Sequence, residues 1–257
     1  MTQEPASIEL KKLRYVINGT VVLDGVDLTM GRGEVVAILG RSGTGKTTLL
    51  RLIMGLVRPT SGHIKINGLD IVGLSEQELD LIRADMGMVF QAGALFDSMT
   101  VGDNVAFGLV EHRRLPASQV AGRVRELLEM VDMAGTEHLM PAQLSGGMRK
   151  RVGIARARAL QPSIMLDDGP TAGLDPISAA AIDNLIHRLC EQVRVATLIV
   201  SHDVHSLRRV ADRAALLDKG IFRAMGPLPE LEASGDPAIR QFLSGSPEGP
   251  LTRDPGH

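Results

Sequence analysis

The chain has 257 residues, 44% hydrophobic and 23% charged, which is the composition of a folded globular protein and excludes a disordered or fibrous one. Its 28 Lys and Arg nearly balance 30 Asp and Glu, and the net charge of -2 disfavours non-specific binding to nucleic-acid phosphates. Aromatic residues make up only 2%, so base stacking on aromatic platforms is disfavoured as well. The single cysteine, Cys190, cannot form an internal disulfide and is expected to be a buried, inert thiol.

The N-terminal segment, MTQEPASIEL, carries neither a basic start nor an apolar run. No later segment approaches the roughly 18 apolar residues that a membrane-spanning helix requires. We therefore expect a cytoplasmic protein that reaches a membrane only through a partner.

Short apolar runs alternate with segments of helical periodicity, which predicts an α/β fold with a parallel or mixed central sheet. The first half is expected to contain strands at Ile8–Leu13, Val21–Leu28 and Val35–Leu39, a helix at Lys46–Leu56, and short strands at Ile64–Ile66 and Met86–Phe90. A mainly helical stretch follows from Thr100 to about Met140, and later strands are expected at Ile164–Leu166, Ala196–Val200 and Ala214–Leu217.

The domain organisation predicted from this order is a single domain over residues 1–250, with flanking helices and a helical subdomain at about 100–160 inserted between two halves of one sheet. From Ser244 onward, the Pro, Gly and Ser content predicts an extended or frayed end, with residues 251–257 as a flexible tail.

A glycine-rich segment, GRSGTGKT, lies between the expected strand Val35–Leu39 and the helix after it, and it fits the pattern GxxxxGK[ST] of a phosphate-binding loop. In such a loop, backbone N–H groups curl around phosphate oxygens and the helix N-terminus adds its positive end. Lys46 is expected to reach the β and γ phosphates, and the Thr47 hydroxyl to ligate Mg²⁺. The expected nucleotide contacts here are Gly40, Arg41, Ser42, Gly43, Thr44, Gly45, Lys46, Thr47 and Thr48.

Five further motifs follow the phosphate loop in order. They are Gln91 after MGMVF, LSGGM at 144–148, Asp168 after an apolar strand, AGLD at 172–175 and SHD at 201–203. The series resembles the Q-loop, signature, Walker B, D-loop and H-loop of ABC-transporter ATPases, from about Ile8 to Pro250. The resemblance implies a P-loop NTPase fold of the ABC-ATPase type, with ATP and Mg²⁺ as ligands and ATP hydrolysis coupled to transport.

The resemblance also implies a role for each motif. The signature helix begins near Ser145, where this residue, Gly146 and Gly147 are expected to hold the γ-phosphate of a partner chain's nucleotide, in a head-to-tail homodimer around two ATP molecules. The implied metal ligands are Thr47, Gln91 and Asp168. The implied catalytic residues are His202, Gln91 and Asp168, with His202 contacting the γ-phosphate and the attacking water.

The residue that would stack on adenine is left open. The family usually places an aromatic residue shortly before the second strand, and the corresponding position holds Ile17. Tyr15, the only tyrosine, lies two residues earlier. Adenine stacking on Tyr15 and plain packing of Tyr15 within a strand are both compatible with the sequence.

The chain departs from the family pattern just after the Walker B strand. Asp168 takes the Walker B position, because Asp175 of the D-loop follows it by 175 minus 168, or 7, residues, as in the family. Gly169 therefore occupies the place of the usual catalytic glutamate, and it cannot accept or orient a proton. General-base help is worth about 10² to 10⁴ in rate. Either the chain binds ATP and hydrolyses it slowly, or it hydrolyses ATP through His202 and the phosphate-bound water; an altered sequence at 169 is a third explanation.

The neighbouring Asp167 is a poor substitute for the missing glutamate. Adjacent residues of a strand point to opposite faces, so Asp167 should point away from the side chain of Asp168. As a carboxylate in an apolar strand, Asp167 is expected to need a hydrogen-bonding partner.

Segments outside the nucleotide motifs carry a narrower resemblance. Gln91–Phe96, Thr100–Phe107, Met140–Met148 and Asp236–Leu243 resemble the ATPases of lipid transporters that work with MCE-domain proteins, of the Mla type. This implies phospholipid transport at the cytoplasmic face of the inner membrane, with an MlaE-like permease, an MCE-domain protein and a small STAS-type regulatory subunit as partners and no nucleic acid. The alternatives are an ATPase for a polar solute and a regulatory ABC module with low turnover.

Overall fold

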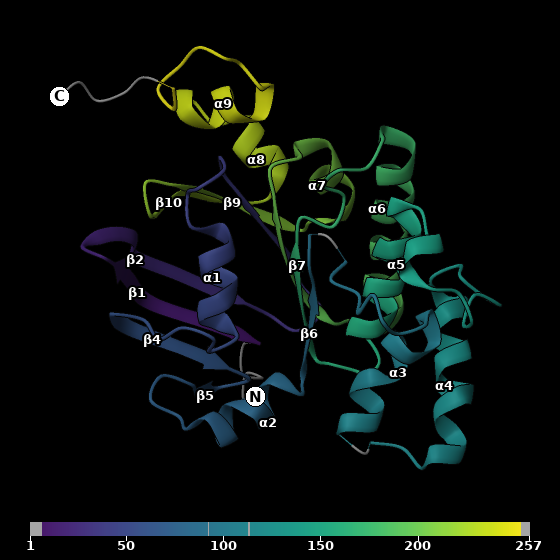
Figure 1. The fold of residues 1–257 in the computed structure, drawn as a ribbon. Helices are drawn as coiled ribbons and strands as arrows, with labels where there is room; N and C mark the ends of the chain where they lie inside the picture. The colour runs from purple at the N-terminus through teal and green to yellow at the C-terminus, as the bar shows by residue number, and fades with distance from the viewer. Residues whose placement is uncertain (1–6, 92, 113, 253–257) are drawn as a thin grey trace, which may run out of the picture. The chain divides into compact units, whose positions relative to one another are not determined.

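The computed structural model describes residues 7–91, 93–112 and 114–252 (Figure 1). The chain divides into two compact units, the first formed by Met1–Gly73 with Val200–His257 and the second by Leu74–Ile199. Ala92, within the predicted Q-loop stretch, and residues 253–257, within the predicted tail, lie outside the described residues. The helical subdomain predicted at about 100–160 stays a prediction.

The first unit contains an antiparallel sheet with the strand order β2-β1-β4-β5. Its strands are β1 (Ile8–Ile17), β2 (Thr20–Met30), β4 (Ser61–Ile66) and β5 (Leu69–Asp70). In β1, Ile8, Leu10 and Leu13 are at most 1% exposed, so one side of the strand forms part of the core. The pairing of β1 with β2 is irregular near Tyr15, because the register shifts once between Leu13 and Tyr15 and again between Tyr15 and Val16.

The same unit contains the buried strand that leads into the phosphate loop. β3 (Val35–Leu39) pairs parallel with β9 (Arg213–Asp218), and β9 pairs antiparallel with β10 (Ile221–Gly226), so this sheet is mixed, as predicted. All five residues of β3 are buried, which is the burial expected of a continuous apolar run covered on both faces. The helices of the unit are α1 (Lys46–Ile53), α7 (Val204–Val210), α8 (Leu228–Glu232) and α9 (Pro237–Ser244).

The second unit combines two parallel strands with several helices. β6 (Met86–Val89) pairs with β7 (Ile164–Asp168), with Val89 opposite Asp167. The helices are α2 (Glu76–Arg83), α3 (Val101–Glu111), α4 (Ala117–Met130), the 3-10 helix η1 (Pro141–Gln143), α5 (Gly146–Ala157) and α6 (Pro176–Val193). Strand β8 (Ala196–Ser201) contains the point at which the chain passes from the second unit back to the first.

The chain after Ser244 differs from the prediction of an extended or frayed end. Leu251 is only 6% exposed, and its N–H donates to the Gln241 side chain at 2.7 Å. The amide nitrogen of Gln241 in turn donates to the Ser246 carbonyl and to the Thr252 hydroxyl, at 3.2 and 3.1 Å. One buried glutamine on α9 thus ties the segment back onto its own helix, which composition alone does not reveal.

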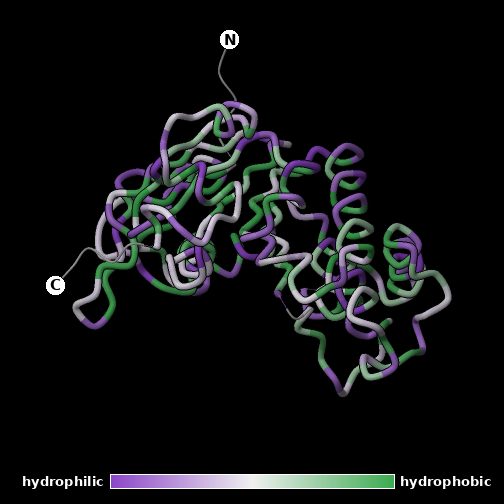
Figure 2. Tube along the Cα trace, turned by 90° about the horizontal axis from the view of Figure 1, so that it is seen from above, coloured by the Kyte–Doolittle hydropathy of each residue, from purple (hydrophilic) through white to green (hydrophobic). Residues whose placement is uncertain are grey.

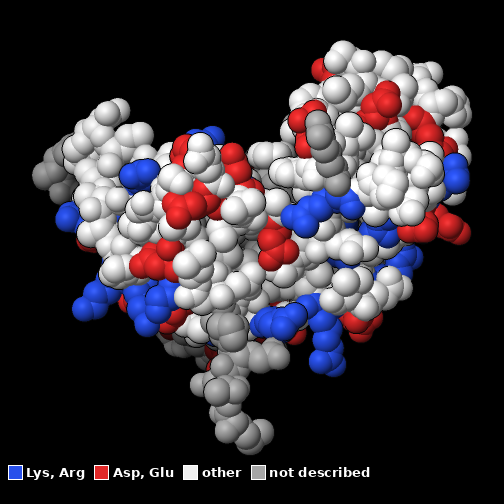
Figure 3. Space-filling view, turned by 90° about the horizontal axis from the view of Figure 1, so that it is seen from below, with Lys and Arg blue, Asp and Glu red and all other residues white. Residues whose placement is uncertain are grey.

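Hydrophobic and hydrophilic stretches alternate along the trace (Figure 2). Within the described parts of the chain, no helix combines the length and the apolar character needed to cross a membrane. On the face that Figure 3 shows, acidic and basic side chains are interspersed, in line with the balanced composition.

Candidate functional site

The predicted phosphate loop leaves the buried strand β3 and ends at the start of α1. Gly40 has φ 155, and a Cβ at this position would lie 2.5 Å from the Leu217 carbonyl oxygen, so only glycine fits without movement of the backbone. The Thr44 hydroxyl donates to the Arg41 carbonyl at 2.9 Å and closes the loop. The Lys46 ammonium donates to the carbonyls of Gly40 and Arg41, each at 2.7 Å.

The start of α1 has the chemistry of an anion site. Its N-cap, Gly45, has φ 100 and provides no side-chain cap, and the first turn contains no acidic residue. The first N–H groups of a helix lack partners within the helix and carry the positive end of its dipole. Together with Lys46, this arrangement fits a phosphate group, and Thr47 and Thr48 follow in the same turn.

The carboxyl ends of β6 and β7 carry the predicted Q-loop and Walker B residues. Because the two strands are parallel neighbours, Gln91 and Asp168 leave the same edge of this pair. Gln91 is exposed and Asp168 half-buried. Gly169 follows with φ 62, a left-handed conformation that disfavours residues with a Cβ. The structure therefore brings these three predicted residues to one edge of the second unit.

Two basic residues of α5 donate hydrogen bonds to main-chain carbonyls at this edge, and neither was among the predicted site residues. Lys150 is 4% exposed and donates to the carbonyls of Gln91 and Gly169, the latter at 3.0 Å. Arg156 donates to the carbonyls of Ala94 at 2.7 Å and Gly93 at 3.1 Å. One sequence signal for Lys150 exists, since it lies four residues before Ile154 on the buried face of the helix.

Asp167 points away from this edge into the interior of the second unit, as strand alternation predicts. It is 3% exposed and lines a cavity of about 20 Å³ with Arg158. Burial raises the pKa of Asp167 to about 7, although the positive charges of Arg158 and Lys150 oppose that increase. The hydrogen-bonding partner expected for Asp167 is not found for Oδ1, which has none among the described residues.

The cavity beside Asp167 also touches the only cysteine. Cys190 is half-buried and not fully buried, which differs from the prediction of a buried thiol. Its Sγ lies 3.5 Å from the Thr197 hydroxyl oxygen.

The signature segment forms a capped helix start, as predicted. Ser145 is the N-cap of α5, and its hydroxyl oxygen accepts the Met148 N–H at 3.3 Å. This leaves the hydroxyl proton for another acceptor. Ser145 is exposed, and Gly146 and Gly147 are half-buried. The segment can therefore present donors to an anion outside the chain.

The remaining predicted residues lie in the first unit. His202 is exposed between Ser201, at the end of β8, and Asp203, which caps α7 by accepting the N–H groups of His205 and Ser206. Tyr15 is half-buried in β1 opposite Leu23. It lies where the register between β1 and β2 shifts, and such irregularities re-aim side chains.

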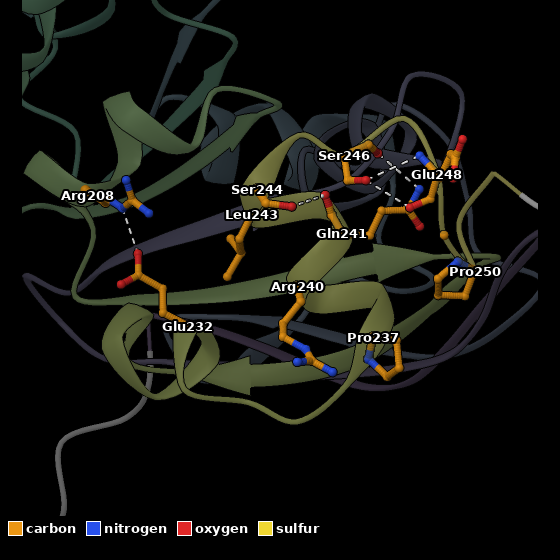
Figure 4. Close-up of a pocket in the computed structure, with 11 residues that line it drawn as sticks. Arg208, Glu232, Pro237, Arg240, Gln241, Leu243, Ser244, Ser246, Glu248 and Pro250 are labelled. Carbon is orange, nitrogen blue, oxygen red and sulfur yellow. Dashed lines mark hydrogen bonds and ion pairs between the residues drawn. The ribbon is translucent and has the colours of Figure 1, made fainter.

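A separate hollow lies elsewhere in the first unit. It has a volume of about 640 Å³ and is lined by residues of α7, α8, α9 and the segment after α9. Figure 4 shows the Arg208–Glu232 ion pair, at 2.7 Å, together with Gln241 and Ser246. None of the predicted nucleotide residues lines this hollow.

Comparison with known proteins agrees with this arrangement of motifs. The family model described as ABC transporter matches residues 23–172, which include the phosphate loop, the signature and Asp168. The chain belongs to the ABC transporter family. It is thus an ABC-type ATPase chain with the α/β fold predicted from its motifs, and adenine nucleotides are its expected ligands.

Several curated relatives of this ABC chain cover nearly its whole length. It is 41% identical over 95% of its length, and 91% of the relative, to the "Intermembrane phospholipid transport system ATP-binding protein MlaF" of Escherichia coli (strain K12). Identity to the protein of the same name from Haemophilus influenzae is 42%, over 95% of this chain and 92% of the relative. The "Probable ribonucleotide transport ATP-binding protein mkl" of Mycobacterium tuberculosis (strain ATCC 25618 / H37Rv) is also 42% identical, over 95% of this chain and 68% of the relative.

Solved structures of ABC proteins share the fold. The ATP-binding cassette MJ0796, a dimer in a post-hydrolysis state bound to ADP and Pi, has a TM-score of 0.78 at 33% identity, covering 86% of this chain and 98% of that one. The cbiO1 protein of Clostridium perfringens, part of the ABC transporter complex cbiONQ, has a TM-score of 0.83 at 30% identity, covering 95% of this chain and 97% of that one.

Proposed function

We propose that this ABC ATPase is the ATP-binding subunit of a phospholipid transporter, acting as a homodimer at the cytoplasmic face of the inner membrane with an MlaE-like permease and an MCE-domain protein. A small STAS-type regulatory subunit is a further proposed partner. The observation that carries the proposal is the 41% identity over 95% of the chain to a phospholipid transport ATP-binding protein, which extends well beyond the nucleotide motifs.

The residues of the phosphate loop would bind the triphosphate of ATP. Its N–H groups and the uncapped start of α1 provide donors for phosphate oxygens. Lys46 would exchange its present carbonyl acceptors, Gly40 and Arg41, for the β and γ phosphates. Ser145, Gly146 and Gly147 would offer a second set of donors to the nucleotide of the partner chain.

Oxygen donors of this chain fit Mg²⁺. Among residues 7–91, 93–112 and 114–252, no three His, Cys, Asp or Glu side chains are grouped to hold a metal ion by themselves. Mg²⁺ in nucleotide sites is held by one or two carboxylates together with phosphates and water, so a single carboxylate with hydroxyl and amide oxygens suits it. Thr47, Gln91 and Asp168 would hold the ion, which neutralises phosphate charge when bound.

Hydrolysis in this chain proceeds without a carboxylate at position 169. His202 is the residue proposed to orient the attacking water against the γ-phosphate. Asp167 does not substitute, because it is buried on the other side of β7. We infer that ATP binding and dimer closure are retained and that turnover is slow.

A second candidate function rests on a specific observation. The mycobacterial relative named for ribonucleotide transport is 42% identical over the same share of this chain, so sequence identity alone does not choose between a lipid and a polar solute. The segments at Thr100–Phe107 and Asp236–Leu243 favour the lipid transporter, because they lie largely outside the nucleotide motifs and resemble that group.

The test is transport by the assembled complex. The tagged chain is purified from native membranes with its permease, reconstituted in phospholipid vesicles, and assayed for ATP-dependent transfer of a fluorescent phospholipid to an added MCE-domain protein. A Lys46→Ala complex is the matched control, and transfer should occur only with wild type. ATP-dependent uptake of a ribonucleotide without phospholipid transfer would support the second candidate and reject the first.

A further inference from the structure

Lys150 is a buried cation that contacts main-chain oxygens of two separate segments. It lies in the second turn of α5 and is 4% exposed. Its ammonium group donates to the carbonyl of Gln91, 59 residues away in sequence, and to the carbonyl of Gly169, 19 residues away. One side chain therefore links the chain after β6 to the chain after β7.

Both segments are tight turns whose direction determines where the neighbouring side chains point. The Gly93 N–H donates to the Phe90 carbonyl at 2.9 Å, and the Ala172 N–H donates to the Gly169 carbonyl at 3.1 Å. The Gly169 oxygen thus accepts from its own turn and from Lys150. Because Gly169 has no side chain to pack, the hydrogen bond from Lys150 adds a restraint from outside to the one that the turn supplies itself.

The buried Lys150 ammonium lies near two main-chain acceptors and near the carboxyl groups of Asp167 and Asp168. Burial lowers the pKa of the Lys150 ammonium, and the nearby carboxylates of Asp167 and Asp168 oppose that decrease. A buried ammonium is costly unless its protons are used, and hydrogen bonds from a charged group are stronger than those between neutral groups. The arrangement differs from that of the next residue, Arg151, which pairs with the exposed Asp132 at 2.6 Å.

We propose that Lys150 is a positioning residue, which fixes the Gln91 segment and the Asp168–Gly169 turn relative to each other so that the side chains of Gln91 and Asp168 are presented together. This inference rests on the proposed function, because Gln91 and Asp168 act on the metal and water of bound ATP only if the chain hydrolyses ATP. Lys150 itself touches neither nucleotide nor metal in this role. Its contribution appears in the rate of the chemical step and not in nucleotide affinity.

The test compares three variants of the assembled transporter. Lys150→Met keeps an unbranched side chain of nearly the same length and removes its donors. Lys150→Arg keeps charge and donors, and Arg151→Met removes the neighbouring cation of the same helix. Single-turnover hydrolysis, binding of a fluorescent ATP analogue and thermal unfolding are measured for each. We expect hydrolysis by Lys150→Met to fall about tenfold to a hundredfold, the effect of losing one strong charged hydrogen bond, with ATP affinity within about twofold of wild type.

Lys150→Arg should recover most of the rate, and Arg151→Met should hydrolyse ATP like wild type. Amide hydrogen exchange should rise in Lys150→Met at Gln91, Gly93 and Ala94 and at Gly169, Thr171 and Ala172, and not in the other described helices and strands. A wild-type rate in Lys150→Met, or a loss of rate, affinity and thermal stability together, overturns the positioning role. Failure of the wild-type complex to bind ATP overturns the proposed function itself, which separates the two outcomes.

Discussion

Placing a glutamate at position 169 is the most direct test of how this chain hydrolyses ATP. If slow turnover results from the missing carboxylate, Gly169→Glu should accelerate hydrolysis by part of the 10² to 10⁴ that a general base contributes. The backbone conformation at position 169 opposes this gain. Position 169 has φ 62, and a left-handed conformation costs a residue with a Cβ about 1–2 kcal/mol.

The space at position 169 is adequate, so the backbone cost dominates. A Cβ there would lie 3.3 Å from the Ala172 Cβ and 3.8 Å from the Gln91 Cγ, which small shifts can relieve. A cost of 1–2 kcal/mol corresponds to about 5-fold to 30-fold in rate if the active state keeps this conformation. The net acceleration expected from Gly169→Glu is therefore roughly 3-fold to 2 × 10³-fold.

The matched control is Gly169→Gln, which has the same backbone cost and nearly the same size but no base. Steady-state ATPase activity of the assembled transporter is compared for wild type and both variants, with ATP binding measured in parallel. We expect the glutamate variant to exceed wild type and the glutamine variant to equal wild type or be slower. Equal rates for the glutamate and glutamine variants, with ATP binding intact, would refute a general-base deficit at this position.

Three further predictions concern stability. Because burial raises the pKa of Asp167 from 3.8 to about 7, its contribution to stability is lost as pH rises from about 4 to 7. In urea unfolding with EDTA present, the unfolding free energy of Asp167→Asn should therefore rise relative to that of wild type across this window, by at most roughly 4 kcal/mol. A difference that stays constant with pH would contradict the titration of a buried Asp167. Gly40→Ala should lower the unfolding free energy by at least about 2 kcal/mol, because its Cβ would lie 2.5 Å from the Leu217 oxygen, whereas Gly43→Ala, with nothing within 4 Å, should lose less; equal losses would exclude the clash. Gln241→Ala should cost about 1–3 kcal/mol and increase proteolysis after Ser244, and an unchanged cleavage rate would mean that Gln241 does not hold the tail.

The parts of the fold that were predicted correctly are those with strong local signals. The run VVAIL is buried throughout as β3, and its bounds match the prediction, because a continuous apolar run of this length is typical of a covered parallel strand. The start of α5 beside Ser145 agrees with the helix start that the signature motif implied, and the serine side chain caps it.

Other elements lacked such signals. The short strand β5 pairs with β4, and the partly exposed strand β10 pairs with β9. These pairings stabilise both strands, but a short stretch of sequence does not reveal which strands will pair. Helix α2 was missed although Ser75 and Glu78 form a capping box, because only Leu79 of the helix is buried and the apolar periodicity is weak.

The predicted site residues were found from motif order, whereas the residues that hold them depend on tertiary contacts. Lys150 contacts Gln91 and Gly169 only because α5 packs behind the ends of β6 and β7. In the sequence, Lys150 stands between Arg149 and Arg151 shortly after LSGGM, so nothing local distinguishes it from the other cations of this basic run. Its burial distinguishes it from both neighbours, and burial is a property of the packed helix.

The two adjacent aspartates show how one strand separates structural and chemical roles. Asp168 ends β7 half-buried at the edge that carries Gln91, while Asp167 faces inward beside Arg158. Lys150 interacts electrostatically with both carboxyl groups and donates a hydrogen bond to the carbonyl of Gly169, the next residue along the chain. Lys150→Met therefore removes both the hydrogen bond to the Gly169 turn and a positive charge that interacts with the buried Asp167. A Lys150→Met, Asp167→Asn double variant should recover thermal stability without recovering the rate of hydrolysis. Recovery of both properties together would show that Lys150 acts through the charge of Asp167 and not through the two carbonyls.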